Sequence, residues 1–154
     1  GTRFGEAVYK AMLGVAGEVP ASGRVLLSVR DDDKTDLLEV GKRLRALGYT
    51  LAATRGSAAA LRHAGLEVDE VNKVREGRPH IVDGLRNGEF CMVVNTTSGE
   101  QAIKDSRSLR RQTLMSGIPY CTTMAGARAT IAALEDAAQV GGRLEPLALQ
   151  DLCG

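Results

Sequence analysis

Short apolar runs alternate with amphipathic, helix-like segments along this chain from residue 23 onward. The apolar runs predict strands over 25–29, 49–53, 66–71, 90–94 and 119–121. The segments between and after them predict helices over 35–47, 57–64, 81–86, 105–115 and 124–138. Strands that alternate with helices are typical of an α/β fold with a parallel sheet. We therefore expect a three-layer, Rossmann-type domain with a mostly parallel five-stranded sheet and helices on both faces.

The two ends of the chain follow a different pattern. A few apolar residues at helical spacing near the start predict a short helix, and residues 14–23 are rich in Gly, Pro and Ser, which is typical of a linker. We interpret residues 1–22 as the tail of a preceding domain plus a linker, and residues 23–154 as one domain. The glycine-rich tail from residue 141 has a short apolar element at 147–149.

Composition argues against several classes of protein. The formal net charge is +1, so bulk electrostatics do not favour nucleic acid or an anionic membrane as a partner. The chain has no Trp and only 3% aromatic residues, too few for base-stacking platforms. Its three cysteines have no metal-ligand spacing, and no segment is long enough to span a membrane. We expect a cytoplasmic protein without a bound metal.

A small-polar turn, Thr54-Arg55-Gly56-Ser57, joins a predicted strand to a predicted helix. Free backbone N–H groups and the helix dipole at such a junction favour an anion, and Gly56 allows it to approach closely. Ser57 is also an ordinary N-cap residue, so this turn alone leaves the interpretation open.

Further strand-end loops bring similar chemistry to the same expected edge of the sheet. In open parallel sheets, ligands bind at the carboxyl ends of the strands. Lys34 and Lys73 follow two of the strands, and the hydroxyl-rich stretch 95–98 follows another. Ammonium groups combined with neutral donors suit a phosphate monoester. Each lysine alone could equally be a solvated surface charge, and the loop 95–98 could be a capping turn.

Several longer segments identify a family resemblance from about residue 23 to the end of the chain. The most specific are Asn72-Lys-Val-Arg-Glu-Gly-Arg-Pro-His-Ile81 and Val94-Asn-Thr-Thr-Ser-Gly99. They make the chain resemble the C-terminal regulatory domain of carbamoyl phosphate synthase large chains, which has the methylglyoxal-synthase-like fold. Shorter matching segments are Leu27–Arg30 with Asp33-Lys34, Ala53–Ser57, Asp105-Ser106 and Tyr120–Thr123.

The resemblance implies a regulatory role. Parent enzymes of this family are glutamine-hydrolysing ligases that make carbamoyl phosphate from bicarbonate, glutamine and ATP with Mg or Mn, for pyrimidine and arginine biosynthesis. Their C-terminal domain binds no cofactor and performs no catalysis, but responds to UMP, IMP and ornithine. The implied partners are the synthetase domains of the same chain, the glutaminase small chain and a possible homo-oligomer contact.

The resemblance also implies roles for individual residues. The effector phosphate would be held by Lys34, Thr54, Gly56, Ser57, Lys73, Asn95 and Thr97. The ribose and base side would involve Thr96, Ser98, Asp105 and Ser106, and the ornithine side would involve Thr122. Ser57 replaces the Thr of many relatives but keeps the hydroxyl, whereas Glu100 is acidic where some relatives are basic, which leaves the effector preference open.

An enzyme with the same fold is a competing interpretation. Methylglyoxal synthase abstracts a proton from dihydroxyacetone phosphate with a carboxylate base, which its family carries in a Gly-Gly-Asp segment. The Gly-Gly pair here, Gly141-Gly142, is followed by Arg143. The sequence therefore disfavours this enzyme.

A metal site or a nucleophilic site has weaker support. His63 and His80 are not at ligand spacing, and the acidic run 31–33 is more typical of a helix start than of a Mg²⁺ site. Ser98 or Cys121 as a nucleophile has no evident neighbouring base. A pure interaction module with a vestigial phosphate site remains an open interpretation.

Overall fold

The structure, a computed structural model, describes residues 22–139, except for the side chains of Arg75, Gln101, Asp105 and Gln139. The short helix, the linker up to residue 21 and the apolar element predicted at 147–149 lie outside this range. The domain boundary predicted at residue 23 stays a prediction. The elements in chain order are β1 (Arg24–Ser28), η1 (Asp31–Asp33), α2 (Lys34–Ala46), β2 (Thr50–Thr54), α3 (Arg55–His63), β3 (Asp69–Val71), η2 (Val74–Glu76), α4 (Ile81–Arg86), β4 (Met92–Asn95), α5 (Glu100–Met115), β5 (Tyr120–Cys121) and α6 (Met124–Gln139).

All five strands pair in parallel, in the order β3-β2-β1-β4-β5. The central strand β1 pairs with β2 on one side and with β4 on the other, with Leu27 opposite both Ala53 and Val94. The chain therefore builds the sheet outward from β1 in one direction and then returns to build it in the other. This arrangement confirms the α/β fold and the five-stranded parallel sheet.

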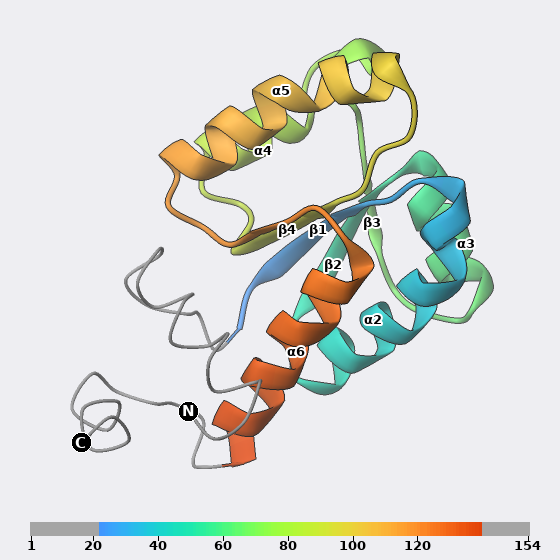
Figure 1. Ribbon diagram of the computed structural model, residues 1–154, viewed down its shortest axis with the longest axis vertical. Coiled ribbons are helices and arrows are strands. Elements are labelled where there is room, and N and C mark those ends of the chain that lie inside the picture. The colour runs from blue at the N-terminus through green and yellow to red at the C-terminus, as the bar shows by residue number, and fades with distance from the viewer. Residues whose placement is uncertain (1–21, 140–154) are drawn as a thin grey trace.

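Helices cover both faces of the sheet, as Figure 1 shows. Helices α2, α3 and α6 lie on one face, where Val25 and Leu27 of β1 are completely buried among their apolar side chains. Helices α4 and α5 lie on the other face, where Leu26 packs with Val93 and Leu109. Successive side chains of a strand point to opposite faces, so the unbroken apolar run of β1 is the pattern of a strand buried on both sides.

Two helices begin earlier than the sequence pattern predicts. Helix α5 begins at Glu100, not at residue 105, because Gly99 with φ 87° turns the chain directly into it. Helix α3 begins at Arg55, so Ser57 lies within the first turn and is not the N-cap, a position that Thr54 takes.

Two further corrections concern the segments around β3. The strand predicted at 66–71 is shortened to Asp69–Val71, because the N–H of Leu66 donates to Leu61 O (3.1 Å) and so closes α3. The 3₁₀ turn η2 at Val74–Glu76 was not expected from the sequence. The remaining predicted elements agree within a few residues, and Thr123 caps α6 as expected by accepting from Gly126 N (3.0 Å).

Within residues 22–139, no helix combines the length and the apolar character needed to cross a lipid bilayer.

We predict that Leu26→Ala destabilises the domain by about 2–5 kcal/mol, because it removes a fully buried side chain between the sheet and helices α4 and α5. Urea unfolding followed by circular dichroism measures this change. Leu114→Ala is the matched control, since Leu114 is 58% exposed, and we expect a change within about 0.5 kcal/mol. Equal effects of the two substitutions would contradict the packing described above.

Candidate functional site: a polar pocket at the strand ends

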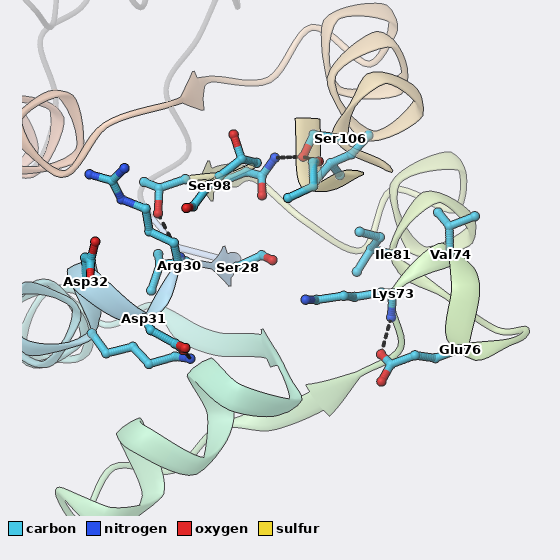
Figure 2. A pocket seen from close by; sticks show the side chains of 17 residues that line it. Ser28, Arg30, Asp31, Asp32, Lys73, Val74, Glu76, Ile81, Ser98 and Ser106 are labelled. Atoms are coloured by element: carbon cyan, nitrogen blue, oxygen red, sulfur yellow. Dashed lines mark hydrogen bonds and ion pairs between the residues drawn. The ribbon is translucent and has the colours of Figure 1, made fainter. Parts of the chain in front are cut away.

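A pocket of about 580 Å³ opens at the carboxyl ends of the strands, where the loops after β1 and β4 lie side by side. Strand order reverses between these two strands, so their following loops lead away to opposite faces and leave a space between them. The lining residues come from the β1–α2 loop, the loop after β3, the start of α4, the β4–α5 loop and the first two-thirds of α5. Figure 2 shows these segments around the pocket.

Two hydrogen bonds hold the loops after β1 and β4 together. The N–H of Arg30 donates to Thr96 Oγ1 (3.0 Å), and the N–H of Thr96 donates to Ser28 O (3.0 Å). Thr96 is buried and also lines the pocket. Its hydroxyl is therefore engaged with the backbone across the strand-order reversal, which favours a positioning role for this residue.

Thr54 and Ser57 are not among the residues that line the pocket, and their hydroxyls bond within the protein. Thr54 Oγ1 donates to Ser28 Oγ (3.1 Å), while Ser57 Oγ accepts from Val29 N (3.0 Å) and donates to Val29 O (3.4 Å). Both side chains are at most 2% exposed. They tie the start of α3 to the end of β1, and so fix the position of Ser28 and Val29, which line the pocket.

Lys34 brings an ammonium group over the first turn of α3. A Cβ added to Gly56 would lie 2.8 Å from Lys34 Nζ, so the missing side chain of Gly56 leaves the space that this ammonium needs. Lys34 Nζ forms an ion pair with Asp31. The hydrogen bond from Lys34 lowers the pKa of Asp31, and the charges of Lys34 and Lys73 lower it further.

Lys73 approaches the pocket from the opposite side. Its backbone N–H donates to Glu76 Oε1 (2.7 Å), which stabilises the turn η2, and Figure 2 shows its side chain extending into the pocket. Asn72 Nδ2 donates to Pro79 O (3.1 Å) and holds the two ends of this loop together. The positive charges of Lys34 and Lys73 thus both stabilise the Asp31 carboxylate.

The β4–α5 side of the pocket is polar and partly preorganised. Asn95 is buried, and its Nδ2 donates to Ser106 Oγ (3.0 Å) and to Tyr120 OH (2.9 Å). Thr97 is half-buried and Ser98 exposed, and both line the pocket. The amide donors of Asn95 are therefore engaged within the protein, whereas the loop that follows faces the open space.

The remaining candidate residues differ in their placement. Ser106 lines the pocket, and its Oγ donates to Ala102 O (2.9 Å). Thr122 is exposed between β5 and α6 and is not among the lining residues. The side chain of Asp105 lies outside the part that the structure describes.

Sequence reasoning assigned no role to several residues that line the pocket. They include Ser28, Arg30, Asp31, Asp32, Val74, Glu76, Ile81, Ala102 and Leu109. The rule that ligands bind beyond strand ends could have identified Ser28 and Arg30, because they end β1 and begin its loop. The apolar members come from η2, α4 and α5, whose approach to the pocket no local pattern indicates.

Metal and thiol chemistry find no support in the described residues. Between residues 22 and 139, no three His, Cys, Asp or Glu side chains group as metal ligands would. Burial raises the pKa of Cys91 to about 11 and also raises that of Cys121, so both thiols stay protonated at neutral pH. His80 accepts from Asp83 N (3.4 Å) as the N-cap of α4.

A family comparison agrees with this geometry. The model of the family described as "MGS-like domain" matches residues 36–122, which is more than half of the chain. The chain belongs to the MGS-like domain family. Curated relatives of this MGS-like domain are carbamoyl phosphate synthase large chains, as the resemblance noted in the sequence implied. That of Halomonas eurihalina is 53% identical over 138 residues, which are 88% of this chain and 13% of the relative.

Two further relatives are also much longer than this chain. The large chain of Buchnera aphidicola is 47% identical over 88% of this chain and 13% of its own, and that of Neisseria meningitidis is 43% identical over 100% of this chain and 14% of its own. This MGS-like domain therefore spans only a small part of the curated relatives it matches. Methylglyoxal synthase from Elizabethkingia anophelis shares the fold, with a TM-score of 0.61 and 16% identity over 73% of this chain and 79% of that one.

We predict that Gly56→Ala weakens the binding of inorganic phosphate about three- to tenfold while leaving the melting temperature nearly unchanged. The added Cβ displaces the end of the Lys34 side chain, which moves without disturbing the core. Calorimetric titration and thermal unfolding measure the two quantities. An unchanged phosphate affinity would show that the position of Lys34 over α3 does not matter for the anion.

Proposed function

We propose that this MGS-like domain is the regulatory domain of a carbamoyl phosphate synthase large chain, and that its pocket binds a nucleoside monophosphate such as UMP or IMP. The observation that carries the proposal is the convergence of Lys34 and Lys73 from opposite sides of one pocket at the strand-order reversal. A phosphate dianion between two ammonium groups gains charge-assisted hydrogen bonds from both.

The pocket offers a phosphate end. Lys34 lies over Gly56 in the first turn of α3, where free backbone N–H groups favour an anion. Lys73 extends toward the same region. Thr54 and Ser57 contribute indirectly by holding the backbone of Ser28 and Val29 in place.

The pocket also offers a nucleoside end. Thr97, Ser98 and Ser106 provide hydroxyls that suit ribose. Val74, which is 38% exposed, provides apolar surface on which the plane of a base can lie, whereas Ile81 and Leu109 line the pocket but are almost fully buried. A cavity of about 580 Å³ falls within the usual range for small-molecule sites, about 300–1,000 Å³.

Regulation requires that occupancy of this pocket reach the rest of the enzyme. Helix α2 begins at Lys34, and its Asp36 and Glu39 pair with Arg128 of α6 at 2.7 and 3.2 Å. Helix α6 follows the exposed Thr122, which we propose faces the synthetase domains and the ornithine site. Coupling between the sites is then reciprocal, so ornithine or ATP binding in the parent enzyme changes nucleotide affinity.

The remaining functional assignments are inferences from the family. The parent enzyme makes carbamoyl phosphate from bicarbonate, glutamine and ATP, with Mg or Mn. It works together with the glutaminase small chain. The domain itself takes no cofactor and is not catalytic, and its exposed surfaces serve contacts with the synthetase domains or a second copy.

An enzymatic role is the second candidate, because Asp31, Asp32 and Glu76 place carboxylates in the pocket. A general base for proton abstraction works best with a pKa near the operating pH. The pKa of Asp31 is instead lowered by its bond to Lys34, and Glu76 accepts from the Lys73 N–H. Asp31 is therefore a weak base, which favours a binding site.

We predict that Lys73→Ala weakens UMP or IMP binding about tenfold or more, because a charge-assisted hydrogen bond to phosphate is lost. Binding of uridine and inosine stays unchanged. Calorimetric titration of the 154-residue chain measures all four ligands. Lys42→Ala is the matched control, since Lys42 is exposed on α2 and does not line the pocket. Equal weakening of nucleotides and nucleosides would contradict the phosphate assignment.

We predict no methylglyoxal when the chain is incubated with dihydroxyacetone phosphate, because Lys34 lowers the pKa of Asp31 and makes this pocket carboxylate a poor base. A colorimetric assay for methylglyoxal, with an authentic methylglyoxal synthase as positive control, measures the outcome. Production that depends on Asp31 or Asp32 would replace the regulatory proposal with an enzymatic one.

A further inference from the structure

We propose that Asp31 is a built-in counter-ion that occupies Lys34 in the empty pocket, and that an incoming phosphate must displace it. Asp31 thereby lowers the affinity of the site for anions, because part of the binding energy is used to break its ion pair with Lys34. This inference rests on the proposed function, because it concerns the same phosphate end of the pocket.

The geometry makes Asp31 the mobile partner of the pair. The Asp31 side chain is 93% exposed, whereas that of Lys34 is 26% exposed and lies against Gly56. Rotating Asp31 into solvent removes little buried surface, so the carboxylate can leave while the ammonium stays. Asp31 also stands in the short turn η1, just before α2, so its movement leaves the core unchanged.

Electrostatics indicate that Asp31 and a phosphate compete for one position. Asp31 lines the pocket, and its negative charge is stabilised by Lys34 through a hydrogen bond and by the charge of Lys73 from the other side. A phosphate bound between the same two ammonium groups would meet the Asp31 carboxylate at short range. Like charges repel at that distance, so both anions cannot hold Lys34 together.

The remaining carboxylates near the pocket have different partners. Asp33 pairs with Arg30 (2.8 Å), and Glu76 accepts from the backbone N–H of Lys73 (2.7 Å). Asp32 lines the pocket and forms no ion pair with any side chain that the structure describes. Among the described side chains, Asp31 is thus the pocket carboxylate that neutralises a pocket ammonium.

The consequence is selectivity by charge. A neutral nucleoside gains nothing from releasing Lys34, whereas a phosphate dianion replaces the lost ion pair with charge-assisted hydrogen bonds. Asp31 therefore lowers the affinity for every anion at this position, and weakly interacting anions lose most because they cannot compensate for the broken pair.

The test is calorimetric titration of the 154-residue chain and its Asp31→Asn variant with inorganic phosphate, UMP and uridine. We expect Asp31→Asn to bind phosphate and UMP about two- to fivefold more tightly, the range of an exposed ion pair, and uridine without change. Asp32→Asn is the matched control, because it removes one negative charge at the same pocket without releasing Lys34. We expect its gain to be less than about twofold at physiological salt, where exposed charges are screened.

A double-mutant cycle with Lys34→Met separates the mechanism from a general charge effect. If Asp31 acts by holding Lys34, the gain from Asp31→Asn disappears in the Lys34→Met background. A gain that persists there, or equal gains from Asp31→Asn and Asp32→Asn, overturns the inference. Phosphate-dependent binding by the unaltered chain with no gain in Asp31→Asn also overturns it but leaves the proposed function intact. If neither chain binds phosphate or UMP while both remain folded by circular dichroism, the proposed function fails and the inference with it.

Discussion

The parallel pairing of β1 with both β2 and β4 is the constraint on which the rest of the structure depends. Leu26 and Leu27 of β1 are completely buried on opposite faces, so the helices must cover both sides of the sheet. Because β2 and β4 flank the same strand, strand order reverses at β1, and the loops after β1 and β4 diverge. The pocket lies where these loops separate, so the packing of the central strand determines where the ligand site can be.

A buried set of hydroxyls holds the end of β1 where it lines the pocket. Ser28, Thr54 and Ser57 are bonded to one another or to the backbone of Val29, and each is at most 8% exposed. A single neutral hydrogen bond contributes only about 1 kcal/mol to stability, but an unsatisfied buried donor costs about 1–3 kcal/mol. The hydroxyls therefore favour one arrangement of the β1 loop over others, which gives Lys34 a defined starting point at the head of α2.

The charges of the pocket are nearly balanced. Arg30, Lys34 and Lys73 line it together with Asp31, Asp32 and Glu76. Because these charges nearly cancel, the preference of such a site for one anion depends on which ion pairs an incoming anion can replace. An exposed acid paired with a more buried lysine is an exchangeable pair, whereas a carboxylate bonded to a backbone N–H is part of the fold. This difference in burial connects the local structure of η1 to the anion binding that we propose for the pocket.

The sequence alone determined the order and type of the five strands and the main helices, because strand and helix periodicity are local properties. It did not determine the start of α5, the length of β3 or the turn η2. It also identified Lys34, Lys73 and the hydroxyl loops as residues at one edge of the sheet. The tertiary structure decided what each of them does. The hydroxyls of Thr54 and Ser57 turn inward to β1, and Asn95 reaches Ser106 and Tyr120, because pairing of distant strands sets these neighbours. Contacts between residues 11 to 28 positions apart depend on register and packing, which no local pattern specifies.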